Sequence, residues 1–170
     1  GAMALLVIAA KFAHVDTSPF TWYIARASGI TLYVLLWVSM MLGLGLTTKY
    51  LDRRVSRATV FSLHAYVTAL SYGFLAMHML SLSADRFSAF SLRDLLIPFH
   101  SPVREPWTGF GVIAGYLMVG IGLSFSLRKL TGYRAWRIVH WLTFLLYLTA
   151  LAHGLGGGTD AMFRPVFIMY

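Results

Sequence analysis

The sequence HAYVTALSYGFLAMH runs from His64 to His78, and HWLTFLLYLTALAH runs from His140 to His153. Apart from the histidines at their ends, both stretches hold only apolar, aromatic and small polar side chains, with no Asp, Glu, Lys or Arg. An α-helix needs about 20 predominantly apolar residues to cross a bilayer. We therefore expect each stretch to form the centre of a membrane-spanning helix that carries a histidine toward each end.

The composition of the whole chain agrees with this expectation. Of its 170 residues, 58% are hydrophobic and 12% are charged, whereas a soluble domain carries about 25% charged residues. Four segments without Asp, Glu, Lys or Arg are long enough to span a membrane: 27–48, 58–83, 109–127 and 138–155. The sequence predicts an all-α integral membrane protein, a bundle of four or five transmembrane helices. The fifth would start near Met162 and be cut short at Tyr170.

The chain is predicted to contain a single domain. Residues 1–3, Gly-Ala-Met, are interpreted as a remnant of the expression vector. Residues 4–19 form an N-terminal segment whose apolar part is too short to span, and residues 20–170 form the membrane domain. The chain has no cysteine, which excludes disulfides, thiolate metal sites, cysteine-ligated iron–sulfur clusters and thiol catalysis.

The basic residues predict the orientation. Loop 49–57 holds four of them against one acid, and loop 128–137 holds four and no acid. Short loops rich in Lys and Arg stay in the cytoplasm, so both loops are predicted to be cytoplasmic and the N-terminus external. The net charge of +8 is then mainly a topology signal, and no nucleic-acid partner is expected. A plasma membrane, such as a bacterial inner membrane, is the predicted location.

The long connection between the second and third spans would then face outward. It includes an amphipathic stretch at 90–99, which is expected to lie flat in the membrane interface. His14 and His100 occur in loop-like surroundings and are expected to be solvated. Four basic residues make the connection a candidate dock for an anionic iron chelate or an acidic redox partner: Arg86, Arg93, His100 and Arg104.

The four intramembrane histidines are the strongest functional signal, since ionisable residues in hydrocarbon are costly. The topology puts His64 and His140 at the inner level and His78 and His153 at the outer level. Fourteen residues of helix rise about 21 Å and return to nearly the same face. Thirteen residues rise about 20 Å but leave His140 and His153 roughly 140° apart around an ideal helix. A π-bulge, a bend or offset ligands would resolve that mismatch.

Two pairs of histidines at two depths match the axial ligands of two haems. Haem b fits best, because the chain has no Cys-x-x-Cys-His for covalent attachment. Several aromatic residues are expected to pack against porphyrin: Phe61, Tyr66, Phe74, Trp141, Phe144 and Tyr147. Two alternatives remain open. The histidines are either helix–helix hydrogen-bonding residues, or ligands of zinc or copper, although metal ligands converge on one point and no intramembrane carboxylate accompanies them.

The sequence from Trp22 to the C-terminus resembles the ferric reductase-like transmembrane domain family. This family includes the membrane parts of ferric-chelate reductases and NADPH oxidases, and the membrane subunit of a bacterial methionine sulfoxide reductase system. The resemblance lies in Ala25-Arg26-Ala27-Ser28-Gly29, in the histidine spacing, in the stretch GYRAWRIVHW from Gly132 to Trp141, and in Ala152-His153-Gly154.

The resemblance implies that His64 pairs with His140 on an inner haem and His78 with His153 on an outer one. It also implies that Arg26 contacts a propionate of the outer haem. An arginine fork suits an anionic propionate and would raise the haem potential.

Two departures from the family limit what can be transferred. Leu82 stands where NADPH oxidases carry a further histidine implicated in oxygen reduction, so dedicated superoxide production is not expected. The chain also lacks a Gly-x-Gly-x-x-Gly pattern and any flavin or nicotinamide domain. It resembles the membrane component of an oxidoreductase whose electrons come from a separate flavoprotein, or from a quinol.

The resulting hypothesis is transmembrane electron transfer through two haem b groups, from a cytoplasmic-side donor to an external ferric chelate or oxygen. One alternative is a quinol-fed haem subunit that passes electrons to an external redox enzyme. The other is a haem-binding sensor or carrier without turnover. No general acid, base or nucleophile is expected among the residues.

Overall fold

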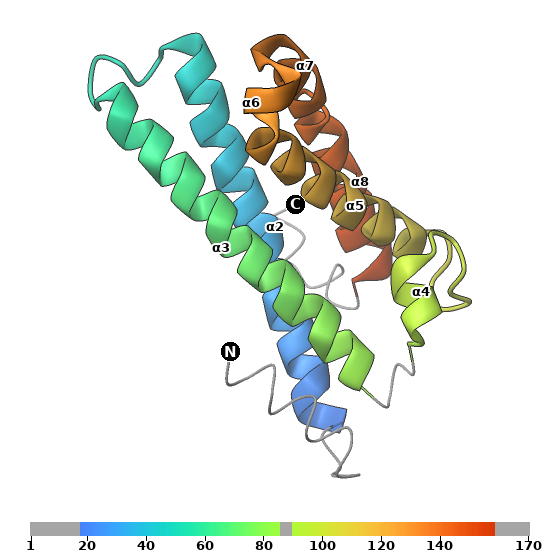
Figure 1. Cartoon of the computed structure of the whole chain (residues 1–170). Helices are drawn as coiled ribbons and strands as arrows, with labels where there is room; N and C mark the ends of the chain where they lie inside the picture. Colours follow the sequence, from blue (N-terminus) through green and yellow to red (C-terminus); the bar gives the residue numbers. More distant parts are fainter. Residues whose placement is uncertain (1–17, 86–89, 159–170) are drawn as a thin grey trace. The chain divides into compact units, whose positions relative to one another are not determined.

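The computed structural model describes residues 18–85 and 90–158, and every regular element in these ranges is an α-helix (Figure 1). Four helical stretches are long and apolar enough to cross a membrane: Phe20–Thr48, Arg57–Ala84, Trp107–Ser126 and Tyr133–Gly157. The predicted fold class, an all-α integral membrane protein, is confirmed. The segment 4–10, His14, Arg86 and the predicted fifth helix after Met162 lie outside the described residues.

Two compact units divide the chain, residues 1–90 and residues 91–170. In the first unit, α2 (Ser18–Thr48) and α3 (Arg57–Ala84) form an antiparallel hairpin and lie side by side (Figure 1). Between them the chain turns at Lys49, which has a φ of 59°. Ser56 caps α3 by accepting a hydrogen bond from the Thr59 amide. Arg57 pairs with Asp52 at 3.0 Å and donates to the Leu46 carbonyl, which ties the turn to the end of α2.

The helix α2 starts nine residues before the predicted boundary at Ala27. The prediction stopped at Arg26 because a charge was taken to end the span. In the structure Arg26 continues the helix, with its guanidinium 5.6 Å from the centroid of the Trp22 ring. Arginine and tryptophan are both favoured where a helix crosses the membrane interface, so a charge at this depth does not end the helix.

A polar contact joins the other end of the hairpin. Thr21 on α2 donates a hydrogen bond of 2.9 Å to the carboxylate of Asp85, which follows the last residue of α3. The two residues are only 1% and 3% exposed. Burial of a carboxylate is costly unless hydrogen bonds replace its lost hydration, so this contact holds the two helix ends together.

The second unit contains α4 (Leu92–Leu96), α5 (Trp107–Ser126), α6 (Arg128–Thr131), α7 (Tyr133–His140) and α8 (Thr143–Gly157). Here α5 and α8 run antiparallel and pack closely: a Cβ on Gly156 of α8 would collide with the Trp107 ring of α5. Small residues permit such close approach between membrane helices.

The connection 128–137 was predicted to be a loop, and this is wrong, because it is mostly helical. The short helix α6 ends at Gly132, whose φ of 86° favours glycine, and α7 begins at the next residue. The prediction used the basic residues to mark a loop, but helical backbone tolerates arginine well. The connection nevertheless keeps its four basic residues.

The fourth predicted span is interrupted at Trp141 and Leu142, between α7 and α8. Here three amides donate to the carbonyl three residues earlier: Trp141 to Ile138 at 3.2 Å, Leu142 to Val139 at 3.0 Å, and Phe144 to Trp141 at 3.2 Å. Such bonds define a 3₁₀ turn, which winds more tightly than an α-helix. The expected solutions to the spacing of His140 and His153 were a π-bulge, a bend or offset ligands; the structure instead has this tighter turn between the two histidines.

Replacement of Thr21 by Val should destabilise the hairpin. The variant removes a hydrogen bond to a buried carboxylate while it preserves the shape of the side chain, and the expected loss is about 1–3 kcal/mol. Thr47→Val is the matched control, because Thr47 is exposed on the same helix and its hydroxyl donates to the Gly43 carbonyl. Unfolding of the purified protein by SDS or heat in lipid nanodiscs measures both; equal stabilities would contradict the role of the Thr21–Asp85 contact.

Candidate functional site

The two histidines of α3 both face α2. Nδ1 of His64 lies 2.9 Å from the Ser39 carbonyl oxygen, and Nδ1 of His78 lies 2.7 Å from the Ala25 carbonyl oxygen. The two acceptors are fourteen residues apart, as are the two histidines. The prediction that His64 and His78 share one face of their helix is thus confirmed.

His153 on α8 repeats this arrangement in the second unit. Its Nδ1 lies 3.0 Å from the carbonyl oxygen of Trp107 at the start of α5. His140, the last residue of α7, is held against an aromatic ring: its imidazole lies 5.2 Å from the Trp136 ring, centroid to centroid, with 31° between the planes.

The carbonyl contacts determine which nitrogen carries the proton. A carbonyl oxygen can only accept, so Nδ1 of His64, His78 and His153 must be the N–H donor. In the neutral ring, Nε2 then keeps its lone pair, which is the atom that binds a metal. A metal-ligating histidine characteristically donates its other N–H to a carbonyl or carboxylate, which fixes the ring and raises its basicity. These three residues therefore fit the donor set of a bis-histidine haem.

Ser39 makes a second contact at the level of His64. Its hydroxyl lies 3.2 Å from Nδ1 of His64 and 2.9 Å from the Thr68 hydroxyl on α3. The His64 ring is thus oriented by both the backbone and the side chain of one residue.

The indole of Trp136 offers a further test of the fit. Its Nε1 is buried and has no hydrogen-bond partner within the described part of the chain. Buried polar groups are nearly always paired, so an unsatisfied N–H calls for an acceptor. Because the ring lies against His140, a carboxylate of a group bound at His140, such as a haem propionate, would satisfy this donor.

Arg26 follows Ala25, whose carbonyl oxygen accepts the hydrogen bond from His78. It therefore lies at the depth of His78, where the resemblance requires it, and its contact with a propionate stays a prediction.

His64 and His78 belong to the first unit, and His140 and His153 to the second. Among residues 18–85 and 90–158 no three side chains of His, Cys, Asp and Glu gather as a metal-binding group.

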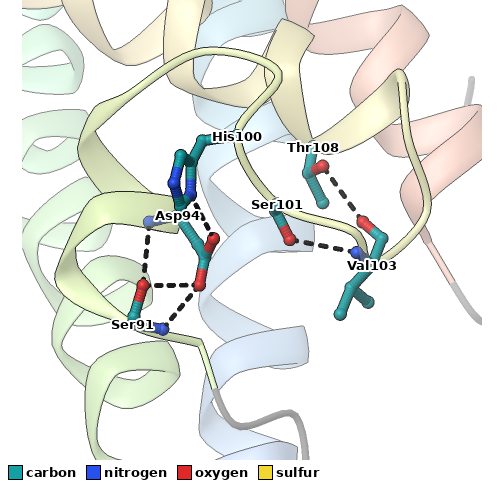
Figure 2. Close-up of polar contacts among 6 residues, drawn as sticks. All are labelled: Ser91, Asp94, His100, Ser101, Val103 and Thr108. Carbon is teal, nitrogen blue, oxygen red and sulfur yellow. Dashed lines mark hydrogen bonds and ion pairs between the residues drawn. The ribbon is translucent and has the colours of Figure 1, made fainter.

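The long connection is organised around Asp94 (Figure 2). Within the predicted amphipathic stretch 90–99 the helix α4 covers Leu92–Leu96, and Ser91 and Asp94 form its capping box. Nδ1 of His100 donates to the Asp94 carboxylate at 2.8 Å. His100 is exposed, as expected for a solvated residue, but it also has this partner. Leu92, Leu96 and Ile97 expose apolar surface, which suits the predicted interfacial position.

Two of the basic residues predicted to form a binding surface on this connection have partners within the protein. His100 pairs with Asp94, and Arg104 donates to the Gly156 carbonyl oxygen at 3.4 Å. Arg93 belongs to the last turn of α4. The dock stays a prediction.

Searches of protein-family models, curated proteins and solved structures find no match to this chain. The function must therefore be inferred from the geometry of the histidines.

The backbone acceptors of the histidines could not be predicted from the sequence. A carbonyl group is present at every residue, and only the pairing of two helices selects Ser39, Ala25 and Trp107. One available signal was the fourteen-residue spacing of Gly29 and Gly43, which equals that of His64 and His78.

Hydrogen bonds from the Ser91 side chain and then from His100 lower the pKa of Asp94 from 3.8 to about 2. Because the folded pKa is depressed, this carboxylate stabilises the connection above pH 3.8, and the contribution is lost as the pH falls toward 2. We expect Ser91→Ala to raise the pKa of Asp94 more than His100→Ala does. A carboxyl ¹³C NMR titration in nanodiscs measures this order, and the reverse order would assign the main role to His100.

Proposed function

We propose that this protein carries electrons across a membrane through two haem b groups, each held by two histidines. The observation that carries the proposal is the common orientation of His64, His78 and His153, whose Nδ1 atoms donate to carbonyl oxygens. In each of these three rings the proton is on Nδ1 and the lone pair on Nε2, which is the atom that a haem ligand offers to the iron.

In this proposal His64 and His140 hold the inner haem, and His78 and His153 hold the outer one. Bound haem supplies one-electron redox chemistry at its iron. The histidines fix its position and coordination, and a hydrogen bond from Nδ1 makes each ring a stronger donor. Arg26 stabilises a propionate at the depth of His78, and the Trp136 N–H stabilises one near His140.

Because two histidines would hold each haem, a substrate would not bind to the iron directly. The external acceptor, a ferric chelate or oxygen, is therefore reduced at the protein surface, without a general acid or base. Leu82 can neither donate a proton nor hydrogen-bond to oxygen, which makes a ferric chelate the better candidate.

The donor acts on the side of the basic connections 49–57 and 128–137, which the positive-inside rule makes cytoplasmic. Arg53, Arg54 and Arg134 are exposed there and would attract an acidic flavoprotein. A membrane quinol is the alternative source of electrons. The protein thus acts as the membrane component of an oxidoreductase, embedded in lipid in a plasma membrane.

Purified protein should contain two low-spin b haems per chain by pyridine haemochrome assay. Replacement of His78 or His64 by Ala removes one axial ligand and should reduce the content to about one haem per chain. His100→Ala is the control and should retain two, because His100 belongs to the external connection and pairs with Asp94. If the wild-type protein takes up no haem from excess hemin, the proposed function is wrong.

Replacement of Arg26 by Ala should lower the midpoint potential of one haem by tens of millivolts and leave the other unchanged. The loss of a positive charge beside a propionate favours the oxidised haem, which is the more positive state. Arg53→Ala, on the α2–α3 turn, is the control for a mere change of net charge. Potentiometric titration resolves the two haems. An equal shift in Arg26→Ala and Arg53→Ala would show that Arg26 does not contact the propionate.

A further inference from the structure

Three glycines occupy equivalent positions beside the three carbonyl-bonded histidines. The acceptors are Ala25, Ser39 and Trp107. Four residues after each acceptor the chain has a glycine: Gly29, Gly43 and Gly111. In an α-helix the carbonyl of residue i already accepts from the amide of residue i+4. Each histidine therefore approaches a carbonyl whose own helical partner is a glycine.

The absence of a side chain at these glycines gives the imidazole room to reach the carbonyl. A Cβ on Gly111 would lie 2.6 Å from Nδ1 of His153, and a Cβ on Gly29 would lie 3.0 Å from Cε1 of His78. Ordinary contacts between carbon or nitrogen atoms need about 3.5 Å or more. On Gly43 the nearest atom, Cε1 of His64, would be at 3.5 Å, which is ordinary contact.

We propose that Gly111 and Gly29 are positioning residues for the haem ligands. Because they have no side chain, the rings of His153 and His78 can approach the carbonyls that orient them. At Gly43 a side chain would fit beside His64 without a close contact, so this glycine does not constrain the ring. The inference rests on the proposed function for its consequence at the haems. It predicts two tightly seated ligands, His78 and His153, which the proposal assigns to the same haem. The orientation of His78 and His153 is therefore stricter than that of His64.

The helix α5 offers a matched control. Gly115 lies one turn beyond Gly111, and a Cβ there would meet nothing within 4 Å. Gly→Ala in a helix interior is intrinsically favourable when space is available. Gly115→Ala should thus leave thermal stability unchanged or slightly raised, whereas the same change at Gly111 forces the His153 ring away from the Trp107 carbonyl. On α3, Gly73 is an equally open control.

The first measurement uses the haem-free protein in lipid nanodiscs, so that it does not depend on electron transfer. ¹⁵N NMR of labelled histidine reports which ring nitrogen carries the proton. We expect Gly111→Ala to change the His153 signals and Gly29→Ala to change the His78 signals. The change should be larger for Gly111→Ala, where the added Cβ would come closer to the ring. Gly115→Ala and Gly43→Ala should leave every histidine signal in place. Wild-type signals in Gly111→Ala would overturn the inference.

The second measurement uses haem-loaded protein. EPR of low-spin ferric haem is sensitive to the orientation of the axial imidazoles, which a general loss of stability does not alter. Gly111→Ala and Gly29→Ala should each shift the signal of one haem, and the same haem in both variants. Shifts of different haems would keep the glycines as positioning residues but refute the pairing of His78 with His153. If the wild type binds no haem, the proposed function fails and the NMR result still decides on the glycines.

Gly111→Ala has the most severe steric consequence, so it is the variant most prone to misfold. Gly29→Ala, with its contact of 3.0 Å, provides the second test against Gly73→Ala. Unchanged His78 signals in a folded Gly29→Ala protein would also overturn the inference.

Discussion

The fold depends on how an imidazole is accommodated within a membrane helix. A neutral histidine has one donor and one acceptor nitrogen, and in hydrocarbon each needs a partner, because no water is present. In this protein the donor is satisfied by the backbone of the neighbouring helix at Ser39, Ala25 and Trp107. These bonds link α3 to α2 and α8 to α5, so the contacts that orient the histidines also hold each helix pair in register.

The register follows from one numerical relation. His64 meets residue 39 and His78 meets residue 25, so that each pair of residue numbers has the same sum, as a regular antiparallel pair requires. A slip by one residue would move both rings away from both carbonyls and both glycines at once. Two equal spacings of fourteen residues on facing helices therefore specify one alignment, which generic apolar packing between membrane helices would not do.

Apolar segments predicted the four spans well, because length and lack of charge are what the bilayer requires. The boundaries at Arg26 and in 128–137 were wrong, since charged residues are compatible with helix at the membrane interface. The α3 site geometry was also predictable, as it follows from helical periodicity alone. Three features were not predictable: the carbonyl partners of the histidines, the contact of His140 with the Trp136 ring, and the burial of the Trp136 N–H. They depend on tertiary contacts that a single sequence does not reveal.

The thirteen-residue spacing of His140 and His153 shows how a locally tighter helical turn changes the angle between two side chains around the helix. An ideal helix leaves the two side chains roughly 140° apart. A residue in a 3₁₀ turn advances about 120° rather than about 100°, so each such residue adds about 20°. The amides of Leu142 and Phe144 make 3₁₀-type bonds, and the Trp141 amide is shared between the Ile138 and Arg137 carbonyls, so the tighter winding reduces the mismatch in part. The turn between α7 and α8 therefore rotates His140 and His153 toward each other around the helix, which a straight α-helix of the same length would not do.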